Sequence, residues 1–385
     1  MTRFEKLLLC LTVFFTSAAL AQTDDAQPAK TSPPVAYVYV SRPTHIDGFA
    51  VSAKGVLTPV PGSPILGKVV GMTASSSYLF GSGADMTNVY SFHIASDGAL
   101  TPAVTTNVQT YNSSGCGGLG PPLLDHTGSS LYVGVSTGGS GPGFDCADGS
   151  FESFSIEKST SDLKFLGITG DIFGFFGQLS FIGDNKFAYG ASCTQEAAGI
   201  AFDLAGFERK SNGDLIYSID GPTPTPKEPD SFYCTLASTS NPSDHLAVVL
   251  QSISNETGES NGPVQLATYS ADSKGNLTTK STYENMAATE VTNITDVEMA
   301  PSGKELVVGG QGFQLFHFNG SSPITKFTGL EQSKVVFRQF RWDNADHLYA
   351  LSGGTLYVYK VTSSGVELLG SISIPEAQGL AVLNK

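Results

Sequence analysis

A repeated pattern of short strands is the feature that most constrains how this chain of 385 residues can fold. The clearest copy lies in Val35–Ile65, where a β-branched and aromatic run is followed by a polar loop and a strand of aromatic–x–apolar form. A glycine turn and a last short strand complete the copy. Short runs of period-2 apolarity, separated by Gly, Asn, Asp, Ser and Pro, are typical of antiparallel β-strands.

The aromatic–x–apolar strand recurs and marks seven copies of this pattern. The seven segments are Phe49–Val51, Phe92–Ile94, Phe154–Ile156, Phe202–Leu204, Tyr269–Ala271, Phe316–Phe318 and Tyr359–Val361. A turn and another strand follow each segment, and six of them are preceded by a turn and strand such as TGSSLYVGV. Repeats of roughly 40–50 residues with four strands each are characteristic of β-propellers. The sequence therefore predicts an all-β fold, a seven-bladed β-propeller over residues 35–385.

The two ends of the repeated region complement each other. Little apolar sequence precedes Ala36, so the first copy lacks an innermost strand, whereas Gly379–Leu383 is a spare strand at the C-terminus. We expect this C-terminal strand to become the innermost strand of blade 1 and to close the ring. Such closure protects sheet edges that would otherwise pair with other chains.

The N-terminus has the pattern of a targeting segment. Two basic residues precede the apolar run Leu7–Phe15, and Ala19–Ala21 forms an A-x-A cleavage signal. We predict a signal peptide over residues 1–21 and a flexible lead-in over residues 22–34. The apolar run is too short to span a bilayer, and no other segment is a candidate span, so we expect a secreted or periplasmic protein.

The charge balance limits the class of partner. The formal net charge of −14 argues against nucleic acid and anionic membranes, and the acidic residues are spread along the chain. We expect a monomer that binds a small polar or anionic ligand or a protein partner. The sequence implies no cofactor and no metal.

Four cysteines remain after the signal peptide, and the repeat places all of them on the face where loops enter the innermost strands: Cys116, Cys146, Cys193 and Cys234. An even count in an exported chain favours two disulfides, and no C-x-x-C spacing suggests a metal site. We favour Cys116–Cys146 and Cys193–Cys234. The sequence leaves the two other pairings open.

Arginine is rare in the chain, and its positions suggest a binding site. Arg42 lies beside His45 in the loop SRPTHID of blade 1, while Arg338 and Arg341 lie on the innermost strand of blade 7. Ring closure makes these two blades neighbours. We therefore expect three of the four arginines that follow the signal peptide to converge.

Two acidic residues on the innermost strand of blade 6, Asp296 and Glu298, project from one face at period 2 and are expected to border the same channel mouth. Carboxylates, a histidine and arginines together suffice to bind a polar or anionic ligand or to perform acid–base chemistry. The catalytic candidates are His45, Arg338 and Asp296, and the ligand-binding candidates are Arg42, Arg341 and Glu298. The alternative is an ordinary rim with internal salt bridges.

Three other histidines share one position in the repeat, the turn before the second strand. They are His126, His245 and His347. Recurrence at one repeat position indicates a solvated turn on the face opposite the long loops, with a structural role.

The phrases AYVYVSRPTHIDGFAVSAKGVLTPVPGSPI and NVYSFHIASDGALTPA resemble the seven-bladed β-propeller lactonase family, which includes 6-phosphogluconolactonase-like and carboxymuconate-cycloisomerase-like proteins. The resemblance covers nearly all of Val35–Lys385 and implies the propeller fold. It also implies lactone hydrolysis or cycloisomerisation as an activity.

The chain departs from the family's pattern at the positions that carry chemistry. Enzymes of the family carry Gly-Pro-His or Gly-Pro-Arg-His where an innermost strand begins, and no histidine here follows Gly-Pro. Asp296–Glu298 keeps the Asp of an Asp-x-His motif without its His, and Gly309–Gln311 lacks the Arg of a later motif. A lactonase needs cations or donors to stabilise the oxyanion. We therefore expect an exported binding or scaffold protein that uses its long-loop face, with a lactone hydrolase or cycloisomerase as the alternative.

Overall fold

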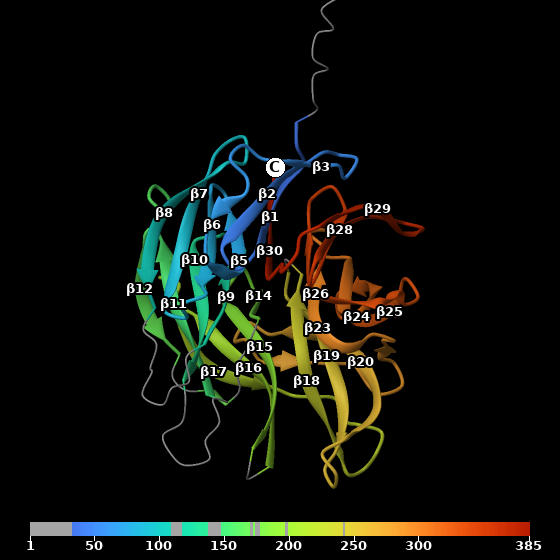
Figure 1. Cartoon of the computed structure of the whole chain (residues 1–385). Helices are drawn as coiled ribbons and strands as arrows, with labels where there is room; N and C mark the ends of the chain where they lie inside the picture. The colour runs from blue at the N-terminus through green and yellow to red at the C-terminus, as the bar shows by residue number, and fades with distance from the viewer. Residues whose placement is uncertain are drawn as a thin grey trace, which may run out of the picture. The chain divides into compact units, whose positions relative to one another are not determined.

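The computed structural model describes residues 33–108, 118–137, 148–169, 172–173, 178–196, 199–241 and 243–385. In these residues every regular element is a β-strand, and all strand pairs are antiparallel (Figure 1). The prediction of an all-β fold is confirmed. No helix in this part of the chain has the length and apolarity needed to cross a membrane.

The described strands form six sheets, in which strands that follow one another in the chain pair with one another. The first sheet contains β1 (Ala36–Ser41), β2 (His45–Val51), β3 (Leu57–Pro59), β4 (Ile65–Leu66) and β30 (Gly379–Asn384). The second contains β5 (Val69–Ser75), β6 (Tyr78–Gly83), β7 (Asn88–Ile94) and β8 (Leu100–Asn107). The third contains β9 (Leu119–Leu124), β10 (Ser130–Thr137), β11 (Asp148–Ile156), β12 (Leu163–Ile168) and β13 (Ile172–Phe173).

The remaining three sheets cover the second half of the chain. The fourth contains β14 (Ser180–Ile182), β15 (Phe187–Glu196), β16 (Gly199–Arg209) and β17 (Leu215–Gly221). The fifth contains β18 (Ser231–Ser240), β19 (His245–Ser254), β20 (Ser260–Ala271), β21 (Leu277–Thr278) and β22 (Ala287–Ala288). The sixth contains β23 (Thr292–Met299), β24 (Glu305–Asn319), β25 (Ser322–Lys326), β26 (Glu331–Trp342), β27 (His347–Ser352), β28 (Thr355–Thr362) and β29 (Gly365–Ser373).

The aromatic–x–apolar segments occupy the strands that the repeat assigns to them, which are β2, β7, β11, β16, β20, β24 and β28. In β2 the side chains of Phe49 and Val51 are buried, while Ala50 between them is half-buried. The period-2 pattern therefore places the large apolar side chains against a neighbouring sheet.

The first and last strands of the described unit share one sheet. β30 pairs antiparallel with β1, with Gly379 opposite Ser41 and Asn384 opposite Ala36. Figure 1 shows this red C-terminal strand beside the blue first strand. The two ends of the repeated region are therefore held together by backbone hydrogen bonds.

Apolar clusters fill the space between neighbouring sheets. One cluster joins Tyr37 of the first sheet to Val69 and Phe92 of the second. Another joins Val38 of the first sheet to Tyr349 of β27. Strands of different sheets also contact one another, since β30 contacts both β5 and β26, and β23 contacts β18. Of these strands, β5, β18, β23 and β26 also line one cavity.

Buried tyrosine hydroxyls join neighbouring sheets. In each case a tyrosine donates to the backbone carbonyl of a turn glycine in the next sheet, and the pairs are Tyr39–Gly98, Tyr132–Gly213 and Tyr189–Gly275. The φ angles of the three glycines are 86°, 100° and 84°, a region that glycine adopts without strain. The repeat therefore encodes contacts between sheets as well as strands within them.

The prediction that His347 lies in a solvated turn is wrong, because its side chain is fully buried. Its Nδ1 lies 2.8 Å from Asp343 Oδ2, which also accepts a hydrogen bond of 2.7 Å from the Tyr349 hydroxyl. Burial alone would raise the pKa of Asp343, but these hydrogen bonds lower it below its usual range. A buried acceptor in the turn therefore draws this histidine inward.

Candidate functional site

Two neighbouring cavities lie between strands of different sheets. The large cavity, of about 450 Å³, is lined by parts of β5, β9, β14, β18, β23 and β26 and by the turns that follow several of these strands. The small cavity, of about 240 Å³, is lined further toward the start of β18 and β23. Both cavities are lined by Leu123, Gln178, Ser238 and Arg341, so they meet at these residues.

A carboxylate–guanidinium cluster lies where the two cavities meet. Asp296 and Glu298 are two residues apart on β23, and both face Arg341 of β26. Arg341 Nη1 lies 3.4 Å from Asp296 Oδ2 and 3.4 Å from Glu298 Oε2. Asp296 lines only the small cavity, while Glu298 lines only the large one.

Asp296 is held by three hydrogen-bond donors. Its Oδ1 accepts a bond of 2.6 Å from Gln178 Nε2, and its Oδ2 accepts a bond of 2.7 Å from the backbone N–H of Phe340 as well as the contact from Arg341. Burial raises the pKa of Asp296, while Arg341 and the other donors oppose that rise. With both oxygens occupied, Asp296 fixes the position of Arg341 and Gln178.

Glu298 is less constrained. Its side chain is 30% exposed, and its Oε1 has no hydrogen-bond partner among the described residues. Burial raises the pKa of Glu298 to about 7, against the opposing effect of Arg341 and with a further rise caused by Asp296. Glu298 therefore presents to the large cavity a carboxylate that gains and loses its proton near neutral pH.

Of the two arginines that line the small cavity, Arg338 and Arg341, only Arg341 forms an ion pair among the described residues. Arg338 is exposed and has neither an ion pair nor a hydrogen bond within the described ranges. Beside it, Gln339 uses Oε1 to accept a hydrogen bond of 2.7 Å from the backbone N–H of Leu380, which leaves its amide NH₂ group available. Both Asp296 oxygens already accept hydrogen bonds. The groups that Arg338 and Gln339 leave free to bond in the small cavity are therefore all hydrogen-bond donors.

The structure places Arg42 and His45 away from both cavities. Arg42 Nε lies 2.7 Å from Asp47 Oδ2 and lines a different cavity with residues of β2 and β29. His45 Nδ1 lies 2.7 Å from Thr44 Oγ1. Of the six predicted site residues, the structure therefore brings together Asp296, Glu298, Arg338 and Arg341. Arg42 finds its carboxylate within its own strand pair, so it does not reach the channel.

The disulfide Cys193–Cys234 links β15 to β18, with 5.3 Å between the Cα atoms, as predicted. Each cysteine lies two residues from a residue that lines the small cavity, Ala191 or Leu236. The disulfide therefore braces strands that border this cavity. Cys116 and Cys146 lie outside the described residues.

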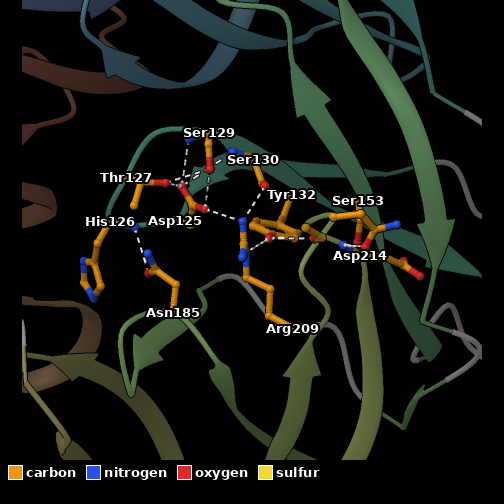
Figure 2. A network of polar contacts seen from close by, with 12 residues as sticks. Asp125, His126, Thr127, Ser129, Ser130, Tyr132, Ser153, Asn185, Arg209 and Asp214 are labelled. Carbon is orange, nitrogen blue, oxygen red and sulfur yellow. Dashed lines mark hydrogen bonds and ion pairs between the residues drawn. The ribbon is translucent and has the colours of Figure 1, made fainter.

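The polar residues around His126 were not among the predicted site residues. Figure 2 shows Arg209 between Asp125 and Tyr132, with its Nη2 2.8 Å from Asp125 Oδ2 and its Nε donating to the Tyr132 hydroxyl at 2.9 Å. The backbone N–H of His126 donates to Asn185 Oδ1 at 3.0 Å. The available signal was the rarity of arginine, since Arg209 was the one arginine in residues 35–385 without an assigned role.

Within the residues that the structure describes, no group of three or more His, Cys, Asp or Glu side chains is arranged to hold a metal ion. No protein-family model and no curated protein sequence matches the chain.

Solved structures provide the informative comparison. Two putative 6-phosphogluconolactonases match, one from Bacteroides fragilis (TM-score 0.58, 12% identity, 93% of this chain and 100% of that one) and one from Bacteroides uniformis (0.57, 14%, 90% and 99%). A protein of unknown function from Desulfotomaculum acetoxidans matches to a similar extent (0.58, 13%, 91% and 98%). At these identities the likeness concerns the fold alone, so the chain has the fold of lactonase-like β-propellers.

Proposed function

We propose that the chain is an exported seven-bladed β-propeller, with a signal peptide over residues 1–21 and a lead-in over residues 22–34. The sixth sheet supports the blade count, because an apolar cluster packs side chains of β24 against those of β26 to β28. Counting that sheet as two blades gives seven, and the pairing of β30 with β1 then closes the ring.

We propose further that this propeller binds a small anionic ligand in the small cavity. The observation that carries the proposal is the guanidinium of Arg338, next to the amide NH₂ of Gln339, both of which lack a partner among the described residues. Charge-assisted hydrogen bonds from a guanidinium to a carboxylate or phosphate are shorter and stronger than neutral ones. A ligand anion supplies acceptors for these two donor groups.

Titration calorimetry of the full chain with inorganic phosphate and with succinate tests this function. We expect saturable binding that becomes at least about tenfold weaker in Arg338→Ala, because a hydrogen bond to a charged group contributes about 1.5–3 kcal/mol. Arg42→Ala is the matched control, since Arg42 lies outside both cavities and pairs with Asp47. Equal binding by Arg338→Ala and the natural chain would remove the proposal.

Lactone hydrolysis in the small cavity is the second candidate. Asp296 is a buried carboxylate whose pKa is raised, and it lies in one cavity with the cation Arg338. In this reaction Asp296 accepts a proton from water as the water oxygen attacks the lactone carbonyl carbon. Arg338 then stabilises the oxyanion, and the ring C–O bond breaks as its oxygen takes up the proton. The engagement of both Asp296 oxygens makes this candidate weaker than binding.

Hydrolysis of D-glucono-1,5-lactone, followed by base uptake at constant pH, separates the two candidates. An enzyme would exceed the spontaneous rate and lose that excess in Asp296→Asn, whose amide keeps the shape of the side chain. A rate equal to the spontaneous one, in protein that still binds phosphate, rules out hydrolysis of this lactone and leaves binding as the function.

A further inference from the structure

The large cavity differs from the small one in its charge. Its Asp125 is fully buried and paired with Arg209, and its Arg341 is shared between Asp296 and Glu298. No unpaired arginine or lysine occurs among the described residues that line it. An anion would therefore meet paired charges here, without a free cation to compensate its loss of hydration.

The free hydrogen-bonding groups of the large cavity include both donors and acceptors. Glu298 Oε1 accepts, and the hydroxyls of Thr73 and Ser240, which have no partner among the described residues, both donate and accept. His126 adds a ring nitrogen. Its Nε2 lies 2.8 Å from the carbonyl oxygen of Phe181, which can only accept, so Nε2 donates to it and Nδ1 is the ring nitrogen left for a ligand.

His126 is held in place before any ligand arrives. Figure 2 shows its turn between Asn185 and the network of Asp125 and Arg209. Asp125 Oδ1 also accepts from the backbone N–H of Ser129 at 2.9 Å, which closes the turn. Fixing a side chain in advance reduces the entropy that is lost when a ligand binds. The buried ion pair therefore acts as a positioning device for the imidazole.

Apolar side chains complete the lining. Phe181, Met299 and Pro301 border the same cavity, and the His126 ring meets the Phe181 ring edge to face at 6.3 Å. Hydroxyls that both donate and accept, combined with apolar C–H surface, are the chemistry of a sugar or another polyol. The volume of about 450 Å³ lies within the range of small-molecule sites.

We propose that the large cavity is a second ligand site, distinct from the anion site, that binds an uncharged polyhydroxylated molecule of the size of a mono- or disaccharide. Glu298 and His126 form hydrogen bonds with its hydroxyls, and Thr73 and Ser240 bond to further hydroxyls. The chain thus carries two sites of different charge that meet at Arg341 and Gln178.

Saturation-transfer NMR on the full chain, with maltose, trehalose and myo-inositol as probes, tests the second site. We expect transfer to at least one probe. We also expect binding to become at least about tenfold weaker in His126→Ala, which removes the ring nitrogen, and in Ser240→Phe, which fills the cavity. Arg42→Ala, outside both cavities, is the control.

Phosphate titration of the same samples separates this proposal from the anion site. We expect both variants to bind phosphate within about twofold of the natural chain, and their thermal unfolding reports on folding independently. Absence of transfer to all three probes overturns the polyol site. Unchanged probe binding by the two variants also overturns it, and so does a loss of phosphate binding that accompanies the loss of probe binding in these variants. Absence of phosphate binding alone overturns only the anion site.

Discussion

At the scale of single residues, the arginines differ in whether they form an ion pair. Of the four arginines in residues 35–385, three are paired with carboxylates, namely Arg42, Arg209 and Arg341. Arg338 is the exception among the described residues. An acidic chain of net charge −14 offers many carboxylates, so this arginine beside a cavity supports the anion site that we propose there.

Removing Arg209 should destabilise the fold strongly. The Asp125 side chain is fully buried and that of Arg209 is 14% exposed, so Arg209→Gln leaves a buried carboxylate without its cation. We expect a loss of about 3–5 kcal/mol in the free energy of unfolding, measured by urea denaturation. Arg42→Gln breaks a more exposed pair and should cost less than about 1 kcal/mol. Equal losses in the two variants would contradict this assignment.

Glu298 should make the stability depend on pH near neutrality. Its pKa in the folded state is raised to about 7 from an ordinary value of 4.5, so folding favours the protonated form. Its contribution to stability is therefore present at low pH and is lost as the pH rises through about 7. We expect the melting temperature of Glu298→Gln, relative to the natural chain, to increase from pH 5 to pH 8.

The comparison needs a control for general charge effects, because Asp296 and Arg341 also face this carboxylate. Glu256→Gln removes an exposed carboxylate in the turn after β19, away from the channel. A relative melting temperature of Glu298→Gln that falls, or stays constant, between the two pH values would refute the role assigned to burial.

At the scale of elements, the tyrosine–glycine bonds explain how neighbouring sheets are aligned. Tyr39→Phe deletes one hydroxyl and leaves the buried Gly98 carbonyl without its donor. We expect this change to cost about 1–2 kcal/mol in urea denaturation. Tyr357→Phe is the matched control, since the Tyr357 hydroxyl has no hydrogen-bond partner among the described residues. A loss below about 0.5 kcal/mol for Tyr39→Phe would show that the bond adds little.

The elements were also the part of the fold that the sequence predicted best. All seven aromatic–x–apolar segments lie in the strands assigned to them, because period-2 apolarity and turn glycines are local signals. The same local argument failed for His347. Its repeat position indicated solvent, but His347 Nδ1 bonds to Asp343 four residues earlier, which also accepts from the Tyr349 hydroxyl, and all three side chains are buried.

At the scale of the whole molecule, the C-terminal strand β30 joins the two ends of the described unit. Leu380 of β30 is fully buried against the apolar cluster that also contains Val38 and Tyr349. Leu380→Ala should cost about 2–5 kcal/mol in the free energy of unfolding. Leu66→Ala, at a leucine that is 72% exposed, should change it by less than about 0.5 kcal/mol. Similar unfolding midpoints for the two variants would show that β30 is dispensable.

The sequence by itself determined the strand repeat, the complementary ends of the chain and the pairing that it favoured for Cys193 and Cys234. It also predicted four of the residues that line the two cavities, Asp296, Glu298, Arg338 and Arg341. The period of 2 on β23 places the first two of them on one face.

Only the tertiary structure decided which polar groups meet. Gln178 reaches Asp296 across 118 residues of sequence, and Arg209 reaches Asp125 across 84. No local pattern records such contacts, because they depend on how separate sheets pack rather than on the conformation of any one strand. For the same reason Arg42 and His45, which the sequence grouped with the other site residues, lie away from both cavities. The presence of two cavities, one with free donors and one with free hydroxyls, likewise became visible only in the folded chain.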